Sequence, residues 1–191
     1  MTEKIRTNVI PLRWVGGVED GHLEMLDQRR LPAEETWLKM TTVSQVAEGI
    51  RTMVVRGAPA IGIAAAYGVA IGFREYGGSP SKEEIAAMFE LLAGTRPTAV
   101  NLFWALDRMR RLLVSIGPDD PGHRIEILFR EARAIMDEDR ENNLTLSRNG
   151  LELFGEHVRV LTHCNTGGLA TGGYGTALGV VRALAEPRLR R

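Results

Sequence analysis

The sequence predicts an α/β fold in which a small N-terminal domain of strands and helices precedes the beginning of a parallel α/β layer. Three observations support this prediction. Two short apolar segments flank a glycine-rich turn near the N-terminus, helical periodicities fill the middle of the chain, and a short apolar segment runs into a glycine-rich loop near residue 164. We expect the first domain to cover residues 1–122, and a linking helix with the α/β layer to cover residues 123–191.

The first two segments predict a β-hairpin. Residues 11–14 and 22–26 can pair because the residues between them include three glycines and an Asp-Gly step, which favour tight turns. Leu31-Pro32 ends this unit. A helix then begins at Thr41 or Thr42, either of which can cap it, and its apolar residues recur at spacings of three and four.

The apolar stretch at residues 58–73 predicts a buried helix, since proline and glycines interrupt it and it is shorter than the about 20 residues of a membrane span. Two amphipathic helices follow. Ser81 and Glu84 form a capping box at the start of the first, and Pro97 suits the first turn of the second, which reaches about Val114.

The sequence of the C-terminal third predicts the first elements of the α/β layer. A long helical segment over residues 123–154, interrupted near Asn142 or Gly150, leads into a buried parallel strand at residues 158–161. A glycine-rich loop follows the strand, and it opens a helix over residues 174–184.

Composition limits the class of protein. The 191 residues are 44% hydrophobic and 25% charged, with 24 basic and 24 acidic residues, as in ordinary soluble globular chains. Zero net charge without a polybasic stripe gives no reason to expect a nucleic-acid partner, and we expect no membrane partner. A single cysteine and an N-terminus without an apolar signal-peptide core favour the cytoplasm.

Cys164 is the first candidate functional residue. It is placed where the predicted parallel strand ends, and ligands bind at that edge of open α/β sheets. The alternative is that the cysteine serves as a small buried apolar residue, which is its commoner role in proteins. Position alone leaves both interpretations open.

The loop after Cys164 fails two tests for nucleotide binding. Gly173 and Gly175 begin a dinucleotide fingerprint, but Leu178 takes the place of its third glycine. Gly167 and Gly172 have the outer spacing of a P-loop, yet its lysine is replaced by glycine. What remains is a glycine-lined turn before a helix, whose free amides can hold a phosphate or another anion.

Arg56 begins a possible phosphate cradle. It precedes Gly57, Ala58 and Pro59, and proline suits the first turn of a helix whose free amides remain available to an anion. The planar guanidinium of Arg56 would add charged donors. The alternative is structural, in which small residues permit a tightly packed helix and Arg56 marks its exposed end. Arg96 likewise precedes a proline, Pro97, at a predicted helix start, where it would bind an anion in the same way. The alternative is that Arg96 is a solvated loop charge.

Three ordered motifs carry a resemblance to a known family. They are MVVRGAPAIGIAAAYG at residues 53–68, TRPTAVNL at residues 95–102 and LTHCNTGGLATGGYGTALGV at residues 161–180. With LRWVGG and MLDQRRLP near the N-terminus, they resemble the methylthioribose-1-phosphate isomerases of methionine salvage. The wider family includes ribose-1,5-bisphosphate isomerases and the regulatory subunits of a translation initiation factor's nucleotide-exchange complex.

The resemblance implies an enzyme, an aldose-ketose isomerase that converts 5-methylthioribose 1-phosphate to 5-methylthioribulose 1-phosphate. It implies that Arg56, Gly57, Ala58 and Arg96 bind the sugar phosphate and that Cys164 stabilises the transition state. It also implies a Rossmann-like domain that is incomplete in this chain, a cytoplasmic homodimer for the full-length family, and no metal or nucleotide cofactor. A noncatalytic sugar-phosphate-binding or regulatory relative, or a ribose-1,5-bisphosphate isomerase, is the alternative.

The chain departs from the resemblance after Ala183. Family members continue beyond this helix and supply a downstream aspartate, the proposed general acid. Asp137 and Asp139 do not lie in that motif. We therefore expect this chain to be a truncated form, inactive alone, with apolar sheet edges and helix faces left uncovered.

Overall fold

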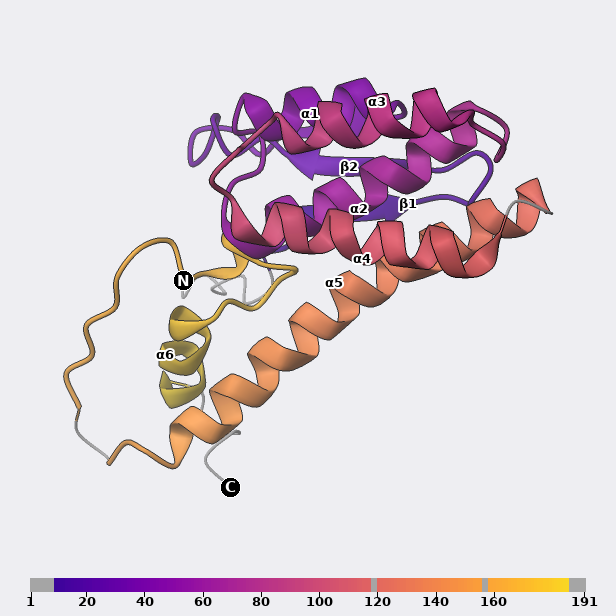
Figure 1. The fold of residues 1–191 in the computed structure, drawn as a ribbon. Coiled ribbons are helices and arrows are strands. Elements are labelled where there is room, and N and C mark those ends of the chain that lie inside the picture. The colour runs from indigo at the N-terminus through magenta and orange to yellow at the C-terminus, as the bar shows by residue number, and fades with distance from the viewer. Residues whose placement is uncertain (1–8, 118–119, 156–157, 186–191) are drawn as a thin grey trace.

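The computed structural model describes residues 9–117, 120–155 and 158–185, a mixed α/β fold with one small sheet (Figure 1). Its strands are β1 (Leu12–Val15), β2 (His22–Leu26) and β3 (Trp37–Met40). Its helices are α1 (Val43–Arg51), α2 (Ala58–Glu75), α3 (Lys82–Ala93), α4 (Val100–Ile116), α5 (Pro121–Leu151), the short 3-10 helix η1 (Gly168–Ala170) and α6 (Ala177–Ala185).

The predicted hairpin is confirmed. Strands β1 and β2 are antiparallel, with Leu12 opposite Met25, and both side chains are fully buried. The third strand, β3, has no counterpart in the prediction. It pairs antiparallel with β2, placing Trp37 opposite Leu26. Four residues are too few for a period-two pattern to stand out from the sequence around them.

Helix α2 is the centre of the core, as the buried helix at residues 58–73 predicts. Every residue from Ala60 to Phe73 is buried, and α1, α3, α4 and α5 all contact the helix. Small residues allow this close packing. A Cβ on Gly62 would lie 2.7 Å from the backbone oxygen of Asn101 at the start of α4, so only glycine permits the two helices to approach so closely here.

The predicted cap of α1 and the predicted capping box of α3 are confirmed, and α1 also has a capping box. Thr42 caps α1 in a reciprocal pair with Gln45, and Ser81 caps α3 with Glu84. The start of α4 differs from the prediction. Pro97 lies in a turn, closed by the Ala99 amide donating to the Arg96 carbonyl at 3.0 Å, and α4 begins only after it. The arginine therefore precedes the helix by a full turn of chain.

Helix α5 runs without the interruption predicted near Asn142. The buried Asn143 side chain donates to the carbonyl of Asp139 one turn earlier, at 2.8 Å, so the polar group is satisfied within the helix. The helix ends directly after Gly150. In Figure 1 its C-terminal half extends beyond the other long helices and carries α6 alongside it.

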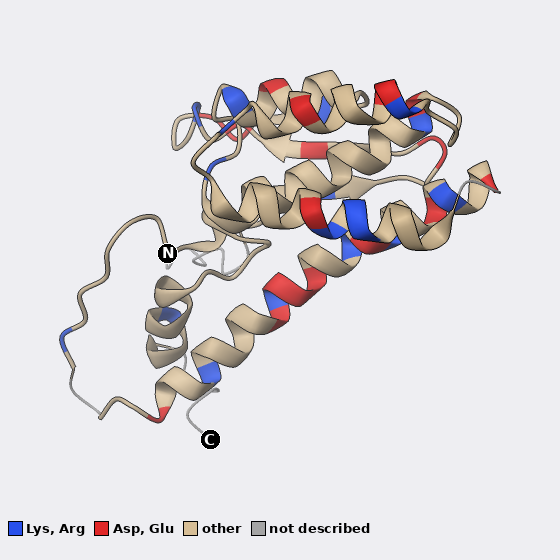
Figure 2. Cartoon of the chain, viewed as in Figure 1, with Lys and Arg blue, Asp and Glu red and all other residues tan. Residues whose placement is uncertain are grey.

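An arginine joins α4 to α5. Arg108 donates to Glu131 and, through two nitrogens, to Glu138, with its Nη2 2.7 Å from Glu138 Oε1. The Glu138 hydrogen bond raises the pKa of Arg108, and the same contact lowers the pKa of Glu138. In Figure 2 the ribbons of both helices carry positions of both charge signs, coloured blue and red. We call Arg108, Glu131 and Glu138 the α4–α5 clasp.

The buried parallel strand predicted at residues 158–161 is absent. This segment has no regular secondary structure, and Leu161 is 97% exposed. A parallel strand needs a neighbour to pair its backbone groups, and within the described residues no strand lies beside it. The helix predicted over residues 174–184 begins later, at Ala177, because Tyr174 has a φ of +69°, which is not helical.

Apolar side chains on helix α4 are exposed, as expected. Val100 is 77% exposed, and Phe103 and Trp104 on the same helix are also exposed. None of the helices in the three described ranges is long and apolar enough to cross a bilayer. The last residues of the chain, beyond Ala185, lie outside the described part.

The central role of α2 gives a stability prediction. Phe73→Ala should lower the free energy of unfolding by about 3–5 kcal/mol, because a fully buried ring leaves a cavity when it is removed. Phe103→Ala on α4 is the matched control, since Phe103 is 43% exposed, and it should cost less than half as much. Urea unfolding followed by circular dichroism measures both. Equal losses would contradict the central position of Phe73.

Candidate functional site

The first predicted site motif forms the start of α2. Gly57 is the N-cap residue, with a φ of +110° that side chains rarely adopt, and Pro59 lies in the first turn. Arg56 and Ala58 are exposed beside it. An exposed arginine therefore stands directly before the first turn of α2, whose leading amides have no partner within the helix.

The second predicted motif lies close to the first. The contact between Gly62 and Asn101 brings the N-terminal turns of α2 and α4 together, and Arg96 is half-buried in the turn before α4. The side chains of Arg56 and Arg96 form no hydrogen bond or ion pair with any described residue. Two arginines without ionic partners thus precede adjacent helix N-termini, where an anion is favoured.

The glycine-rich loop after Cys164 packs against the start of α2. A Cβ on Gly57 would lie 2.4 Å from both Cα and Cβ of Ala170, so the two backbones are in direct contact. An antiparallel bridge between Gly167 and Gly175 closes the loop. The fold therefore brings the first and third sequence motifs together although they are more than a hundred residues apart.

Two polar side chains hold this loop, Gln28, which is buried, and Asp139, which is partly buried. The Gln28 side chain, 3% exposed, donates to the Leu169 carbonyl at 2.8 Å. On the other side, Asp139 Oδ2 accepts from the Gly172 amide at 2.6 Å and from Asn143 Nδ2 at 3.0 Å. Burial raises the pKa of Asp139, while the hydrogen bonds from Gly172 and Asn143 act in the opposite direction.

Sequence reasoning did not single out Gln28 or Asp139 as site residues. The sequence does contain a recognisable pattern around each of these two residues. Gln28 follows an apolar strand in the MLDQRRLP motif, and Asp139 with Asn143 places two polar side chains one turn apart on the same helix face. Neither pattern indicates which loop the side chains will hold, because the contacts span 141 and 33 residues of sequence.

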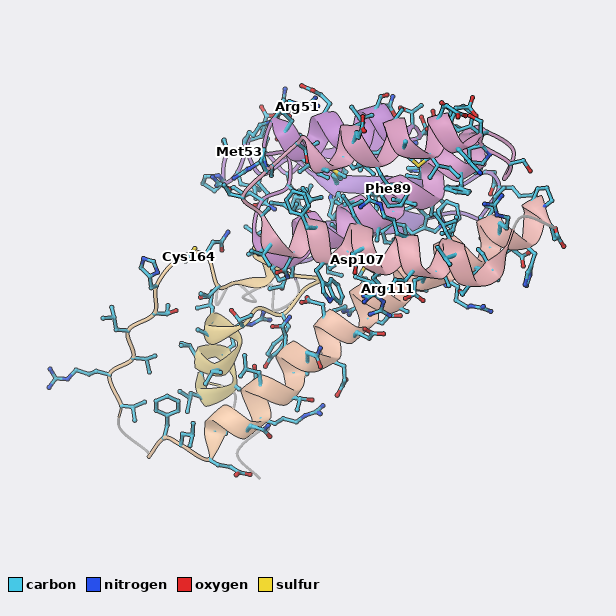
Figure 3. All side chains as sticks on the ribbon, in the orientation of Figure 1. Arg51, Met53, Phe89, Asp107, Arg111 and Cys164 are labelled. Carbon is cyan, nitrogen blue, oxygen red and sulfur yellow. The ribbon has the colours of Figure 1, made fainter. Side chains whose placement is uncertain are left out.

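Cys164 lies on the exposed segment that leads into the loop, outside the helical body (Figure 3). The interpretation of Cys164 as a small buried residue is therefore wrong for this structure. Its φ is +68°, an uncommon conformation for a non-glycine residue and typical of functional or strained positions. Its thiol forms no hydrogen bond with Arg56, Arg96 or any other described side chain.

A cleft of about 330 Å³ adjoins the loop and the two helix starts. Ile63 joins the two features, since it lines the cleft and its Cδ1 would lie 3.2 Å from a Cβ on Gly172. Apolar and polar side chains share the walls, which suits a ligand with both characters. The lining residues are Pro59, Gly62, Ile63, Val100, Asn101, Trp104, Ile135, Glu138, Asp139 and Asn142.

Comparison with known proteins gives the family. The Initiation factor 2 subunit family matches residues 54–191. The chain belongs to this family. The matched residues include the start of α2 and the whole glycine-rich loop, the two segments that meet at Gly57 and Ala170.

Individual relatives include isomerases. The chain is 52% identical over 178 residues to the methylthioribose-1-phosphate isomerase of Pelotomaculum thermopropionicum, covering 92% of this chain and 48% of the relative. The crystal structure of 5-methylthioribose 1-phosphate isomerase from Pyrococcus horikoshii OT3 has a TM-score of 0.80 at 40% identity, covering 92% and 49%. The chain therefore spans about half the length of the curated relatives it matches.

A second solved structure carries a different name. The translation initiation factor eIF-2B, subunit delta, from A. fulgidus has a TM-score of 0.75 at 36% identity, covering 93% of this chain and 51% of that chain. One fold thus belongs to relatives named as an enzyme and as an initiation factor subunit. Fold similarity by itself does not decide between these two functions.

The contact between Gly57 and the loop gives a second prediction. Gly57→Ala should displace η1, because the added Cβ overlaps Ala170 and the backbone conformation disfavours side chains. Hydrogen exchange of residues 168–171 should accelerate at least tenfold. Gly77→Ala is the control, since Gly77 also has a positive φ but no atom within 4 Å of the added Cβ. Accelerated exchange of the loop in both variants would contradict the proposed contact.

Proposed function

We propose that this chain forms part of an aldose-ketose isomerase that converts 5-methylthioribose 1-phosphate to 5-methylthioribulose 1-phosphate in methionine salvage. The observation that carries the proposal is the packing of the loop after Cys164 against the start of α2, beside two arginines without ionic partners. This arrangement offers an anion site and a thiol on adjoining segments. The relatives from P. thermopropionicum and P. horikoshii are named for this activity.

The phosphate is the group that the helix starts would bind. Arg56 and Arg96 supply charge-assisted donors, and the amides at Gly57 and Ala58 add neutral ones. The phosphate of this substrate blocks the anomeric carbon, so the sugar ring does not open spontaneously to a free aldehyde. A firmly held phosphate orients the ring so that the enzyme can assist its opening.

Cys164 would act at the reacting carbons. After ring opening, hydrogen moves from C2 to C1, so that C2 becomes the ketone carbon and C1 carries two hydrogens. A thiol beside these carbons can donate or receive a proton, or polarise an oxygen, where water is excluded. In the described residues Cys164 is exposed, so a further segment must cover it before chemistry begins.

Further parts of the proposal concern the assembled enzyme. We place the boundary between the strand and helical domain and the α/β domain near residue 122. The segment at 158–161 would join a Rossmann-like parallel sheet when other strands pair with it, since its three apolar residues, Val158, Val160 and Leu161, are exposed. A homodimer working in the cytoplasm is the expected assembly.

A second candidate function is a noncatalytic regulatory subunit. The similarity to the A. fulgidus protein favours this function, because that protein shares the fold and is named as an initiation factor subunit. Cys164 and the two arginine motifs favour the enzyme instead. A regulatory relative would bind a sugar phosphate without isomerising it.

A chimaera tests the proposed function. This chain is fused to the part of the P. thermopropionicum isomerase that lies beyond the matched residues, and the ketose product is followed by NMR. We expect turnover of 5-methylthioribose 1-phosphate in preference to ribose 1,5-bisphosphate. A folded chimaera that binds the substrate without turnover would favour the regulatory subunit.

In the same chimaera, Arg56→Ala or Arg96→Ala should weaken substrate binding by roughly ten- to a hundredfold, since each removes a contact of about 1.5–3 kcal/mol.

Cysteine variants separate chemistry from binding. Cys164→Ser in the chimaera should lower kcat far more than it raises KM, because the thiol is proposed to act on the reacting carbons and not on the phosphate. Cys164→Ala should be equally impaired, whereas a cysteine with only a packing role tolerates a small apolar replacement. Steady-state kinetics measure both variants. Proportionate changes in kcat and KM would refute the assigned role.

A further inference from the structure

A second cavity, of about 150 Å³, lies between the hairpin, α2 and α5, and no part of the proposed reaction uses it. One wall is aromatic. Trp14 stacks on Tyr67 with ring centroids 5.7 Å apart and planes 2° from parallel, and it contacts Phe129 at 4.4 Å. The other lining residues are Val18, Glu126, Arg130 and Arg133.

The hydroxyl of Tyr67 is the unusual feature of this cavity. Tyr67 is 1% exposed, and its hydroxyl oxygen has no hydrogen-bond partner among the described residues. Buried polar atoms are normally paired, by protein or by another bound group. Burial raises the pKa of Tyr67 and the Asp137 carboxylate adds to this, whereas the nearby Arg133 guanidinium lowers it. Arg133 therefore lies within reach of the hydroxyl.

Hydrogen-bond donors outnumber acceptors around the cavity. Arg130 and Arg133 lie three residues apart on α5 and form no ion pair with a described carboxylate. Arg74 adds a third positive charge, 5.4 Å from the Trp14 ring, although its guanidinium already donates to the carbonyls of Val18 and Gly21. The indole nitrogen of Trp14 likewise donates to Gly16 and Gly17.

Fewer negative than positive side chains lie near the cavity. Glu126 is the carboxylate among its lining residues, and Asp137 lies one turn beyond Arg133 on α5. A ligand that supplied several acceptors would pair the Tyr67 hydroxyl and both arginines at once. The volume is about five times that of one liquid water molecule, which fits a tetrahedral oxyanion but not a sugar phosphate.

We propose that this cavity binds a small tetrahedral oxyanion, such as inorganic phosphate, with Tyr67, Arg130 and Arg133 as donors. The site differs from the proposed sugar-phosphate site, since its lining shares no residue with the cleft beside the glycine-rich loop. Its occupant would link the hairpin to α5 through Trp14 and the arginines. The bound anion would thereby stabilise the domain and need not enter the reaction.

Isothermal titration of the full chain with inorganic phosphate tests the proposal. The titration uses a background of Arg56→Ala and Arg96→Ala, so that phosphate at the sugar-phosphate site does not contribute. We expect saturable binding that weakens about tenfold in Tyr67→Phe, which removes only the hydroxyl, and by at least as much in Arg133→Gln. Far-UV circular dichroism of each variant shows that the fold is retained.

Arg111→Gln is the matched control, since it removes the same charge from the exposed surface of α4 (Figure 3). It should leave the phosphate dissociation constant unchanged. Absence of saturable binding, or equal affinity in wild-type and Tyr67→Phe cavities, would overturn the proposal. Because the experiment measures no turnover, its outcome is independent of whether the chain contributes to an isomerase.

Discussion

Helix α2 is buried on every side, and this burial determines where the other elements lie. An all-apolar helix in water must be covered around its whole circumference, so α1, α3, α4 and α5 pack against different faces of it. The same helix begins at Gly57, in contact with the loop after Cys164. The position of the candidate site is thus a consequence of core packing, because moving α2 would separate the loop from the arginine turns.

Local signals made much of the fold predictable. The hairpin followed from the glycines and the Asp-Gly step of its turn. The cap at Thr42 and the capping box at Ser81 followed from side chains that bond within their own helix starts. Failures occurred where the outcome depends on distant partners. The segment at 158–161 has strand-like residues, but a strand exists only when another strand pairs with it.

The candidate site was predictable in its parts but not in its assembly. The residue types of Arg56, Gly57 and Arg96 indicated helix starts suited to anions, and the structure has α2 and α4 beginning beside each other. Gln28 and Asp139 were missed because their function is to hold a loop remote in sequence. No periodicity encodes such a contact, which depends on the whole chain having folded.

The α4–α5 clasp implies that the cleft responds to ionic strength. Glu138 lines the cleft, and Arg108 also lies 5.5 Å from the ring centroid of Trp104, another lining residue. The Glu138 carboxylate is half exposed, so dissolved ions screen its attraction to Arg108 more than they screen a buried pair. Apolar contacts between helices do not weaken in this way. We therefore expect added salt to weaken this contact at the wall of the cleft while the apolar packing around α2 persists.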